Sequence, residues 1–214
     1  MQQHVSPDGV VDYRGFIRDR VALRAYLDLL AAHPPERKTW TDDERKAYWI
    51  NAYNAFTVDI VTRNYPVASI KDIGPALSIP FVNSVWDIKF IRIGEERLDL
   101  NNIEHRKLRK GFGDARIHFA IVCASASCPR LRNEAFVAER LDQQLDAQAR
   151  AFINDEFRNR IRPNELELSK IFSWFKGDFT QETDLIGYLQ AYTEIELNPR
   201  AKIASKKYDW GLNE

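Results

Sequence analysis

The chain has 214 residues, of which 44% are apolar and 29% are charged, a composition that is typical of a folded domain and excludes an intrinsically disordered chain. Lysine and arginine together number 31, as do aspartate and glutamate, so the formal net charge is zero. This balance argues against general binding to nucleic acids or membrane surfaces, because both favour proteins with a basic excess.

The first part of the chain contains two predicted helices. Apolar residues at helical spacing predict an amphipathic helix over residues 19–32, which ends before a pair of prolines. Thr41 is a good N-cap residue and Glu44, three residues later, completes a capping box, so a second helix is expected from here to Asn64. Its middle, residues 48–56, carries few charges, which indicates a helix at the centre of the core.

The remainder of the chain predicts short strands and further helices. Turn residues between apolar runs predict two β-hairpins, over residues 86–100 and 158–168. A short helix, capped by Asn101 and with Glu104 at its third position, is expected over residues 101–109. Further helices are expected over residues 133–154, 169–176 and 183–193.

These elements lack the regular strand–helix–strand alternation that builds a parallel sheet. No internal repeat, low-complexity stretch or linker divides the sequence. We therefore expect one α+β domain over residues 1–214, with helices packed around a small, mostly antiparallel sheet. No apolar run reaches the roughly 18 residues of a membrane-spanning helix, so no transmembrane segment is predicted.

The clearest chemical signal is a run of apolar residues that leads into a loop of small side chains. Residues 117–123 are predicted to form a buried strand, and Cys128 lies near the end of the loop that follows. Small side chains leave main-chain N–H groups accessible, and these donors stabilise a thiolate. Arg130 and Arg132 would act in the same direction. The sequence therefore makes Cys128 a candidate nucleophile, the alternative being a thiol packed beneath the next helix.

Strand geometry separates the other candidates on this segment. In a regular strand Cys123 and His118 point to opposite faces, and Cys123 falls in an apolar row, which favours a role as a small core residue. His118 has small neighbours on its own face, and the loop beyond it could bring Cys128 back towards it. His118 is therefore a candidate general base, with a purely structural histidine as the alternative.

A second candidate pair lies on the short helix after the first hairpin. Glu104 could orient a histidine as the third member of a triad, although the capping role already noted is the simpler interpretation. His105 is the rival base. Asn51 and Asn54 lie in the largely apolar helix, where buried amides need partners; they are interpreted mainly as ties to nearby loops, with one of them lining the cleft as the alternative.

Metal and disulfide chemistry are the competing interpretations of the cysteines. His118, Cys123 and Cys128 are spaced by five and five residues, which is not a known zinc pattern, so no metal and no cofactor are expected. A disulfide between Cys123 and Cys128 is sterically possible if the loop turns back. Their spacing does not match that of thioredoxin-like redox motifs.

Several segments together resemble a family of bacterial and plant proteins catalogued as domain of unknown function 547. The matching segments are residues 48–55, 100–109, 118–129, 168–175, 178–179 and 208–210. They define a family-like core over about residues 48–210, preceded by an N-terminal helical extension over residues 1–40. The resemblance implies that these side chains occupy motif positions, without assigning their roles: Asn51, Asn54, Glu104, His105, His118, Ser127 and Cys128.

The leading hypothesis is a thiol-dependent hydrolase or acyl transferase, similar in logic to papain-like and transglutaminase-like enzymes, acting on an amide or peptide bond. Cys128 would be the nucleophile, His118 the base and Glu104 its orienting group. The backbone N–H groups of Ser127 and Cys128, with an amide such as Asn51 or Asn54, would bind substrate and stabilise an oxyanion. The alternatives are a non-catalytic domain that binds a small ligand or peptide, with structural or paired cysteines, and a metal-binding protein.

The place of action is left open by the residues alone. Two cysteines are too few for a disulfide scaffold, and the first residues lack the apolar core of a signal peptide. The resemblance implies export, since bacterial members of the family are exported, and it favours the cell envelope: a periplasmic or secreted protein whose export signal is absent from this chain. The other expectation is a cytoplasmic protein.

Overall fold

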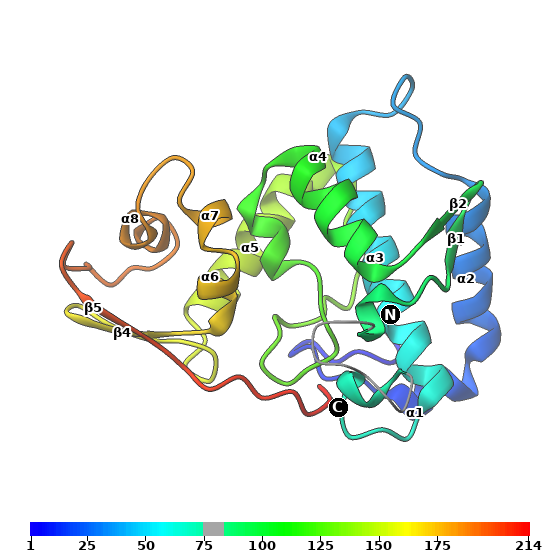
Figure 1. Ribbon diagram of the computed structural model, residues 1–214, viewed down its shortest axis with the longest axis horizontal. Coiled ribbons are helices and arrows are strands. Elements are labelled where there is room, and N and C mark those ends of the chain that lie inside the picture. The colour runs from blue at the N-terminus through cyan, green and yellow to red at the C-terminus, as the bar shows by residue number, and fades with distance from the viewer. Residues whose placement is uncertain (75–83) are drawn as a thin grey trace.

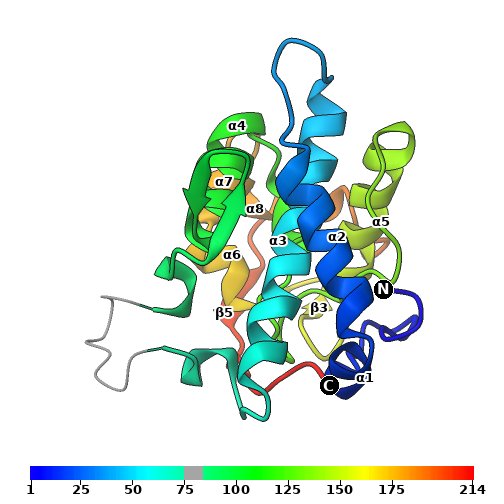
Figure 2. The ribbon, with the colours of Figure 1, turned by 90° about the vertical axis from the view of Figure 1, so that its right-hand side faces the viewer.

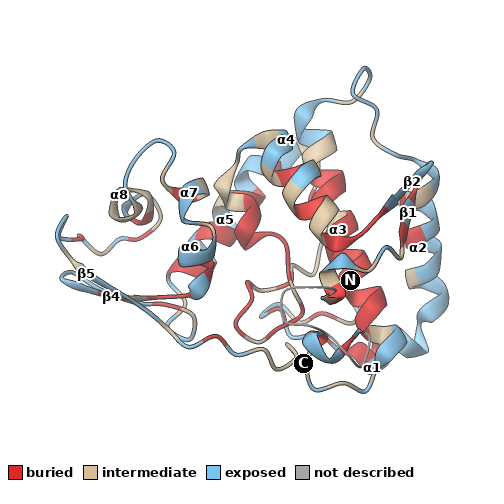
Figure 3. Cartoon of the chain, viewed as in Figure 1, coloured by how far each residue is buried: buried red, intermediate tan, exposed pale blue. Residues whose placement is uncertain are grey.

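A long central helix organises the structure, a computed structural model that describes residues 1–74 and 84–214 (Figure 1). Helix α3 (Asp42–Asn64) begins at the predicted capping box, in which Thr41 Oγ1 accepts the N–H of Glu44 and the Glu44 carboxylate accepts the N–H of Thr41. The predicted end of the helix is confirmed. Most side chains between positions 47 and 61 are buried, as expected for a helix that is apolar on most sides (Figure 3).

One flank of α3 is covered by the N-terminal helices and the first hairpin. Helix α1 (Tyr13–Arg18) and helix α2 (Arg20–Ala32) both contact α3, and α2 also contacts strand β1 (Figure 2). Strand β1 (Ile91–Ile93) pairs in antiparallel register with β2 (Glu96–Leu98), so the predicted hairpin is confirmed over a shorter range. The outer face of α2 is exposed, as its amphipathic pattern predicts.

The other end of the molecule holds a three-stranded sheet with the order β3-β4-β5. Strand β3 (Arg160–Arg162) and β4 (Glu165–Leu168) form the second predicted hairpin, and β5 (Lys202–Ser205) adds in parallel to β4. Around this sheet stand helices α5 (Leu141–Ile153), α6 (Lys170–Trp174), α7 (Lys176–Phe179) and α8 (Leu185–Gln190). The predicted α+β class, with helices around small and mostly antiparallel sheets, is confirmed.

Short helical turns connect these parts. They are η1 (Ile70–Asp72), η2 (Val85–Asp87), the π-helix η3 (Asn102–Arg109), α4 (Lys110–Phe112), η4 (Ala115–Phe119) and η5 (Ala138–Arg140). The predicted helix after the first hairpin is therefore present, but its expected cap is wrong. The N–H of Asn102 donates to Asp99 Oδ1 over 2.6 Å, whereas the Asn101 side chain makes no capping bond. Glu104 is consequently not needed at the helix start and lies in the interior.

The buried strand predicted over residues 117–123 is wrong. Residues 117–119 are the end of η4, and the rest is irregular backbone that is followed by Ala124, whose φ is positive at 58°. Its polar groups are satisfied by side chains instead of by a neighbouring strand: Asn54 donates to the carbonyl of Ala120 and accepts the N–H of Val122, and Gln148 donates to the carbonyl of Phe119. The apolar run is thus buried without forming a strand, because side-chain amides from α3 and α5 make the hydrogen bonds that a neighbouring strand would otherwise make.

The helix predicted over residues 133–154 begins later, at Leu141. Side chains hold the residues before it in irregular conformation. Asn51 donates to the carbonyl of Phe136 and accepts its N–H, while Gln144 accepts the N–H of Val137. The amides of Asn51 and Asn54 therefore both tie a loop to α3, in agreement with the structural interpretation of these residues.

Within the described residues, no helix combines the length and the apolar composition that crossing a bilayer requires. This agrees with the prediction from hydropathy.

The tie made by Asn54 gives a test of the fold. Replacing Asn54 with alanine leaves one buried N–H and one buried carbonyl without partners, so we expect a loss of about 2–4 kcal/mol in the free energy of unfolding, measured by urea denaturation. Asn64→Ala on the same helix is the control, because its exposed amide bonds only within α3, and it should change stability by less than about 0.5 kcal/mol. Equal effects of the two substitutions would contradict the role given to Asn54.

Candidate functional site

Four predicted catalytic residues meet at one cavity of about 190 Å³. They are Glu104, His105, His118 and Cys128. The cavity lies between α3, η3, the irregular segment after η4, helix α6 and the C-terminal tail. A larger hollow of about 480 Å³ beside the N-terminus is lined by Asn51 and Asn54, and another of about 690 Å³ lies near α8 and β5. Neither these two hollows nor two others of about 400 Å³ contain a predicted catalytic residue, so the smaller cavity is the candidate site.

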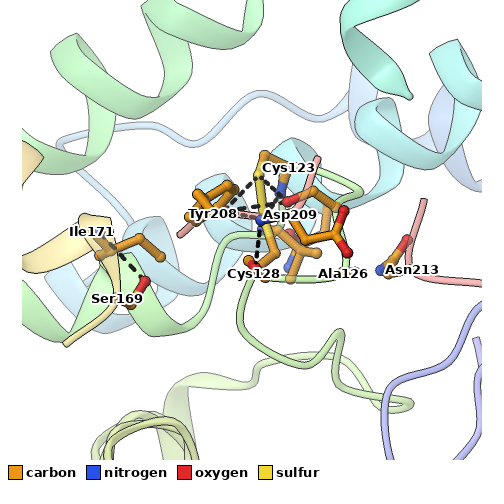
Figure 4. Close-up of a disulfide and its surroundings, with 12 residues drawn as sticks. Cys123, Ala126, Cys128, Ser169, Ile171, Tyr208, Asp209 and Asn213 are labelled. Carbon is orange, nitrogen blue, oxygen red and sulfur yellow. Dashed lines mark hydrogen bonds between the residues drawn. A yellow bond between two sulfur atoms is a disulfide. The ribbon is translucent and has the colours of Figure 1, made fainter. Parts of the chain in front are cut away.

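The two cysteines form a disulfide in the wall of this cavity (Figure 4). Cys128 is only 2% exposed, and its Sγ accepts the N–H of Cys123 over 3.0 Å and the hydroxyl of Tyr208 over 3.3 Å. The structure thus contains the Cys123–Cys128 disulfide that the sequence analysis gave as an alternative, and neither cysteine is free. A disulfide sulfur has no proton to lose, so Cys128 is not an ionisable nucleophile in this state.

The prediction that His118 and Cys123 face opposite sides is wrong, because it assumed a strand. With η4 and irregular backbone in its place, both residues line the same cavity. The period of two that separates faces in a strand does not hold here.

His118 is paired with Asp178 of α7 and not with Glu104 as predicted. His118 Nε2 lies 2.7 Å from Asp178 Oδ2, and the ring stacks on Phe175 with centroids 4.0 Å apart. Burial lowers the pKa of His118 to about 4, so the ring is neutral near pH 7. A carboxylate only accepts hydrogen bonds, and geometry therefore assigns the single ring proton to Nε2 and leaves Nδ1 as an acceptor.

Asp178 is in turn held by Arg109. The guanidinium donates from Nε to Asp178 Oδ2 over 2.6 Å and from Nη2 to Oδ1 over 2.9 Å. These bonds, together with His118, lower the pKa of Asp178 to about 2. A third Arg109 nitrogen lies 3.1 Å from His105 Nδ1, which therefore accepts, and burial lowers the pKa of His105 as well. The result is a continuous polar chain from His118 to His105 in which the charges of Asp178 and Arg109 compensate.

Glu104 stands apart from this chain. The side chain of Glu104 is buried. Among the described residues, its one hydrogen-bond donor is the hydroxyl of Tyr53, which lies 3.4 Å from Glu104 Oε2. Burial raises the pKa of Glu104 to about 7, opposed by the positive charge of Arg109. A group that titrates near neutral pH inside a cavity suits acid–base chemistry or the binding of a charged ligand.

The predicted oxyanion donors are already engaged. The N–H of Ser127 donates to the carbonyl of Asp209, and the N–H of Cys128 donates to that of Ser125. The hydroxyl of Ser127 accepts the N–H of Asp209 over 2.8 Å, so this residue fastens the C-terminal tail. None of Asn51, Asn54 and Ser127 lines the central cavity.

Sequence reasoning missed much of the cavity wall. The additional lining residues are mostly aromatic: Tyr53, Trp86, Trp174, Phe175, Tyr208 and Trp210. The partners of the histidines, Arg109 and Asp178, were also missed, because a separation of 69 positions leaves no local pattern. The available signal was their presence in the segments that carry the family resemblance.

Among residues 1–74 and 84–214, no three histidine, cysteine, aspartate or glutamate side chains are arranged to hold a metal ion.

Comparison with known proteins gives one match. Residues 37–153 match the family model described as "Protein of unknown function, DUF547", which covers more than half of the chain. No curated protein and no solved structure matches.

The opposite pKa shifts of Glu104 and His118 predict opposing pH dependences. Relative to ordinary values of 4.5 and 6.5, folding raises the pKa of Glu104 and lowers that of His118. Between about pH 4.5 and 6.5 the folded state binds a proton at Glu104 that the unfolded state does not, so the contribution of Glu104 to stability falls as the pH rises. In the same range the folded state lacks a proton at His118 that the unfolded state binds, so the contribution of His118 increases.

In the parent protein these two slopes oppose each other. We expect Glu104→Gln to make the change in unfolding free energy with pH more positive by up to about 1.4 kcal/mol per pH unit, and His118→Gln to make it more negative by a similar amount. Urea denaturation at several pH values measures both, with His33→Gln, at an exposed position, as the control. Shifts of the same sign in both variants would contradict the assignment.

Proposed function

The chain belongs to the DUF547 family of proteins of unknown function, and we propose that it is a ligand-binding domain whose central cavity takes a small molecule or a peptide side chain. The observation that carries this proposal is the pairing of one buried, poorly satisfied carboxyl group, Glu104, with a wall of aromatic side chains. Cavities that bind small ligands typically combine apolar walls with a few converging polar groups.

The polar side of the cavity offers several groups to a ligand. Glu104 uses one long hydrogen bond where a carboxylate accepts up to about four. His118 keeps an acceptor at Nδ1, and His105 keeps a proton at Nε2, since their other nitrogens are taken by Asp178 and Arg109. The two histidines are held by the same polar chain, which supports a site that is organised before the ligand arrives.

The disulfide favours binding over thiol chemistry. It joins the loop of small residues to itself beside Tyr208 and so makes a rigid part of the wall. While the bond is intact the site has no thiolate, and the non-catalytic alternative needs none.

A thiol-dependent hydrolase or acyl transferase, active only when the disulfide is reduced, is the second candidate. The observation in its favour is that Cys128 Sγ already accepts from the Cys123 N–H and the Tyr208 hydroxyl, donors that would stabilise a thiolate. In this mechanism His118 takes the proton of the reduced Cys128 thiol, and Asp178 has the orienting role that the sequence gave to Glu104. The sulfur bonds to the amide carbonyl carbon, the C–N bond breaks, and the amine leaves with the proton from His118. Water or another amine then releases the acyl group from the thioester.

We further propose that the protein works in an oxidising compartment such as the cell envelope. A disulfide between two cysteines five positions apart persists where thiols are not kept reduced. This supports the exported location that the family resemblance implies.

The binding proposal predicts responses confined to three tryptophans. In spectra of the ¹⁵N-labelled protein, at least one of phenol, benzoate and tetramethylammonium should shift the indole signals of Trp86, Trp174 and Trp210. Trp40 and Trp49 lie outside the cavity and serve as internal controls.

A variant that fills the cavity should abolish the response. Ile171 lines the cavity, and Ile171→Trp should weaken binding at least about tenfold, a loss of about 1.4 kcal/mol. Ile203→Trp, on exposed strand β5, is the matched control. The proposal is rejected if no probe moves the three signals, or if Ile171→Trp binds as the parent does.

The state of the cysteines is tested by alkylation. Without reductant the folded protein should resist iodoacetamide and weigh two hydrogens less than the reduced chain. If the second candidate holds, Cys128 in the reduced protein should react near pH 6, below the range of an ordinary thiol with a pKa of about 8.5, and His118→Gln should abolish this reactivity while His33→Gln does not. Reaction only above about pH 8 would rule out an activated nucleophile. Free thiols before reduction would contradict the disulfide wall.

A further inference from the structure

We propose that the central cavity selects an organic cation, an alkylammonium group held between the Glu104 carboxylate and the aromatic rings of Trp86, Trp174, Tyr208 and Trp210. This inference rests on the proposed binding function and names the chemical class of its ligand.

Of the charged groups around the cavity, one has no compensating charge. The ionisable carboxyl and imidazole groups that line it, among the residues the structure describes, are Glu104, His105 and His118. Both histidines are kept neutral by burial, and behind them the charges of Arg109 and Asp178 cancel in a two-bond ion pair. An ionised Glu104 is therefore the net charge that the cavity presents to a ligand, and its sign attracts cations.

Glu104 also lacks the partners that buried carboxylates normally have. In the described part of the chain no lysine or arginine lies within ion-pair distance of it, and the Tyr53 hydroxyl is 3.4 Å away. A bound ammonium group would supply both the missing positive charge and, where it carries protons, the missing donors. An anion would meet the Glu104 charge and find Arg109 already occupied by Asp178.

The aromatic part of the cavity wall is built of ring systems at differing angles. The centroids of Tyr208 and Trp210 are 4.6 Å apart, and those of Trp174 and Tyr208 4.8 Å. Trp86 meets Trp210 at 66°. Rings set at angles around one space surround a rounded group better than a flat one, and aromatic faces attract ammonium groups electrostatically. The Nζ of Lys71, which does not line the cavity, lies 4.8 Å from the centroid of Trp210, so one ring of this group already contacts a cation.

The cation proposal has a defined pH dependence. The groups that act on Glu104 are Tyr53 from α3, Arg109 from its own helix, and Asp178 from α7, and the two histidines face the same space. Binding of a cation favours the ionised carboxylate, so affinity should rise as the pH passes through about 7 and level off above it. Below that range affinity should fall by up to about tenfold per pH unit.

The decisive experiment compares choline with 3,3-dimethylbutan-1-ol, a neutral alcohol of nearly the same shape. Calorimetry on the parent protein near pH 8, with the three indole signals as a second readout, should give choline an affinity at least about tenfold higher than the alcohol. Near pH 6 this ratio should shrink towards one. Because it uses the unmodified protein, the comparison does not depend on any variant folding.

Variants then assign the charge to its source. Glu104→Gln should bring choline and the alcohol to similar affinities and remove the pH dependence, whereas Glu95→Gln, whose side chain is 99% exposed, should leave both unchanged. Trp174→Leu should weaken choline more than the alcohol, since it removes a ring face as well as apolar surface.

The outcomes separate the two proposals. If phenol, benzoate or the alcohol binds in the cavity and choline binds no better, the cation inference is overturned while the binding function stands. If no probe, charged or neutral, moves the indole signals, both fail. Choline preference that survives Glu104→Gln would also overturn the inference, because the charge would then lie elsewhere.

Discussion

The rest of the site depends on the hydrogen bonds that α3 makes to a buried segment without regular structure. Among the described residues no strand pairs with residues 120–122, and the amide of Asn54 satisfies both the carbonyl of Ala120 and the N–H of Val122. From α5, the side chain of Gln148 donates a hydrogen bond to the carbonyl of Phe119. Buried backbone groups must be paired, so these side chains decide the path of the chain. That path turns His118 and both cysteines towards one cavity, where a strand would have separated them.

Around the cavity, electrostatics divides the ionisable groups into two sets. Asp178, Arg109 and the two histidines form a connected chain in which each charge has a partner. Glu104 is buried and has no such partner among the described residues, and its burial raises its pKa to about 7. This separation supports the proposed binding function, because the first set holds the geometry of the cavity and Glu104 is the carboxyl group that we propose meets a ligand.

The disulfide changes what this arrangement can do. The residues that would support a thiolate, Cys123 through its N–H and Tyr208 through its hydroxyl, instead surround a sulfur that is already bonded. The two functions proposed for the cavity therefore differ in the redox state of the cysteines that each requires. In the oxidised form, which the structure shows, we propose a binding site with an aromatic wall, and only reduction would release a thiol in the cavity that His118 also lines.

The sequence by itself determined the local elements: the capping box of Thr41 and Glu44, the central helix, both hairpins and the family. These follow from contacts within a few residues, which a sequence pattern records directly. The conformation of residues 117–123, the pairing of His118 with Asp178 and the isolation of Glu104 were decided by tertiary structure. The physical reason is that an apolar run signals burial without specifying backbone conformation, and that the partner of a buried polar group is whichever side chain the fold brings near, however far away it lies in the chain.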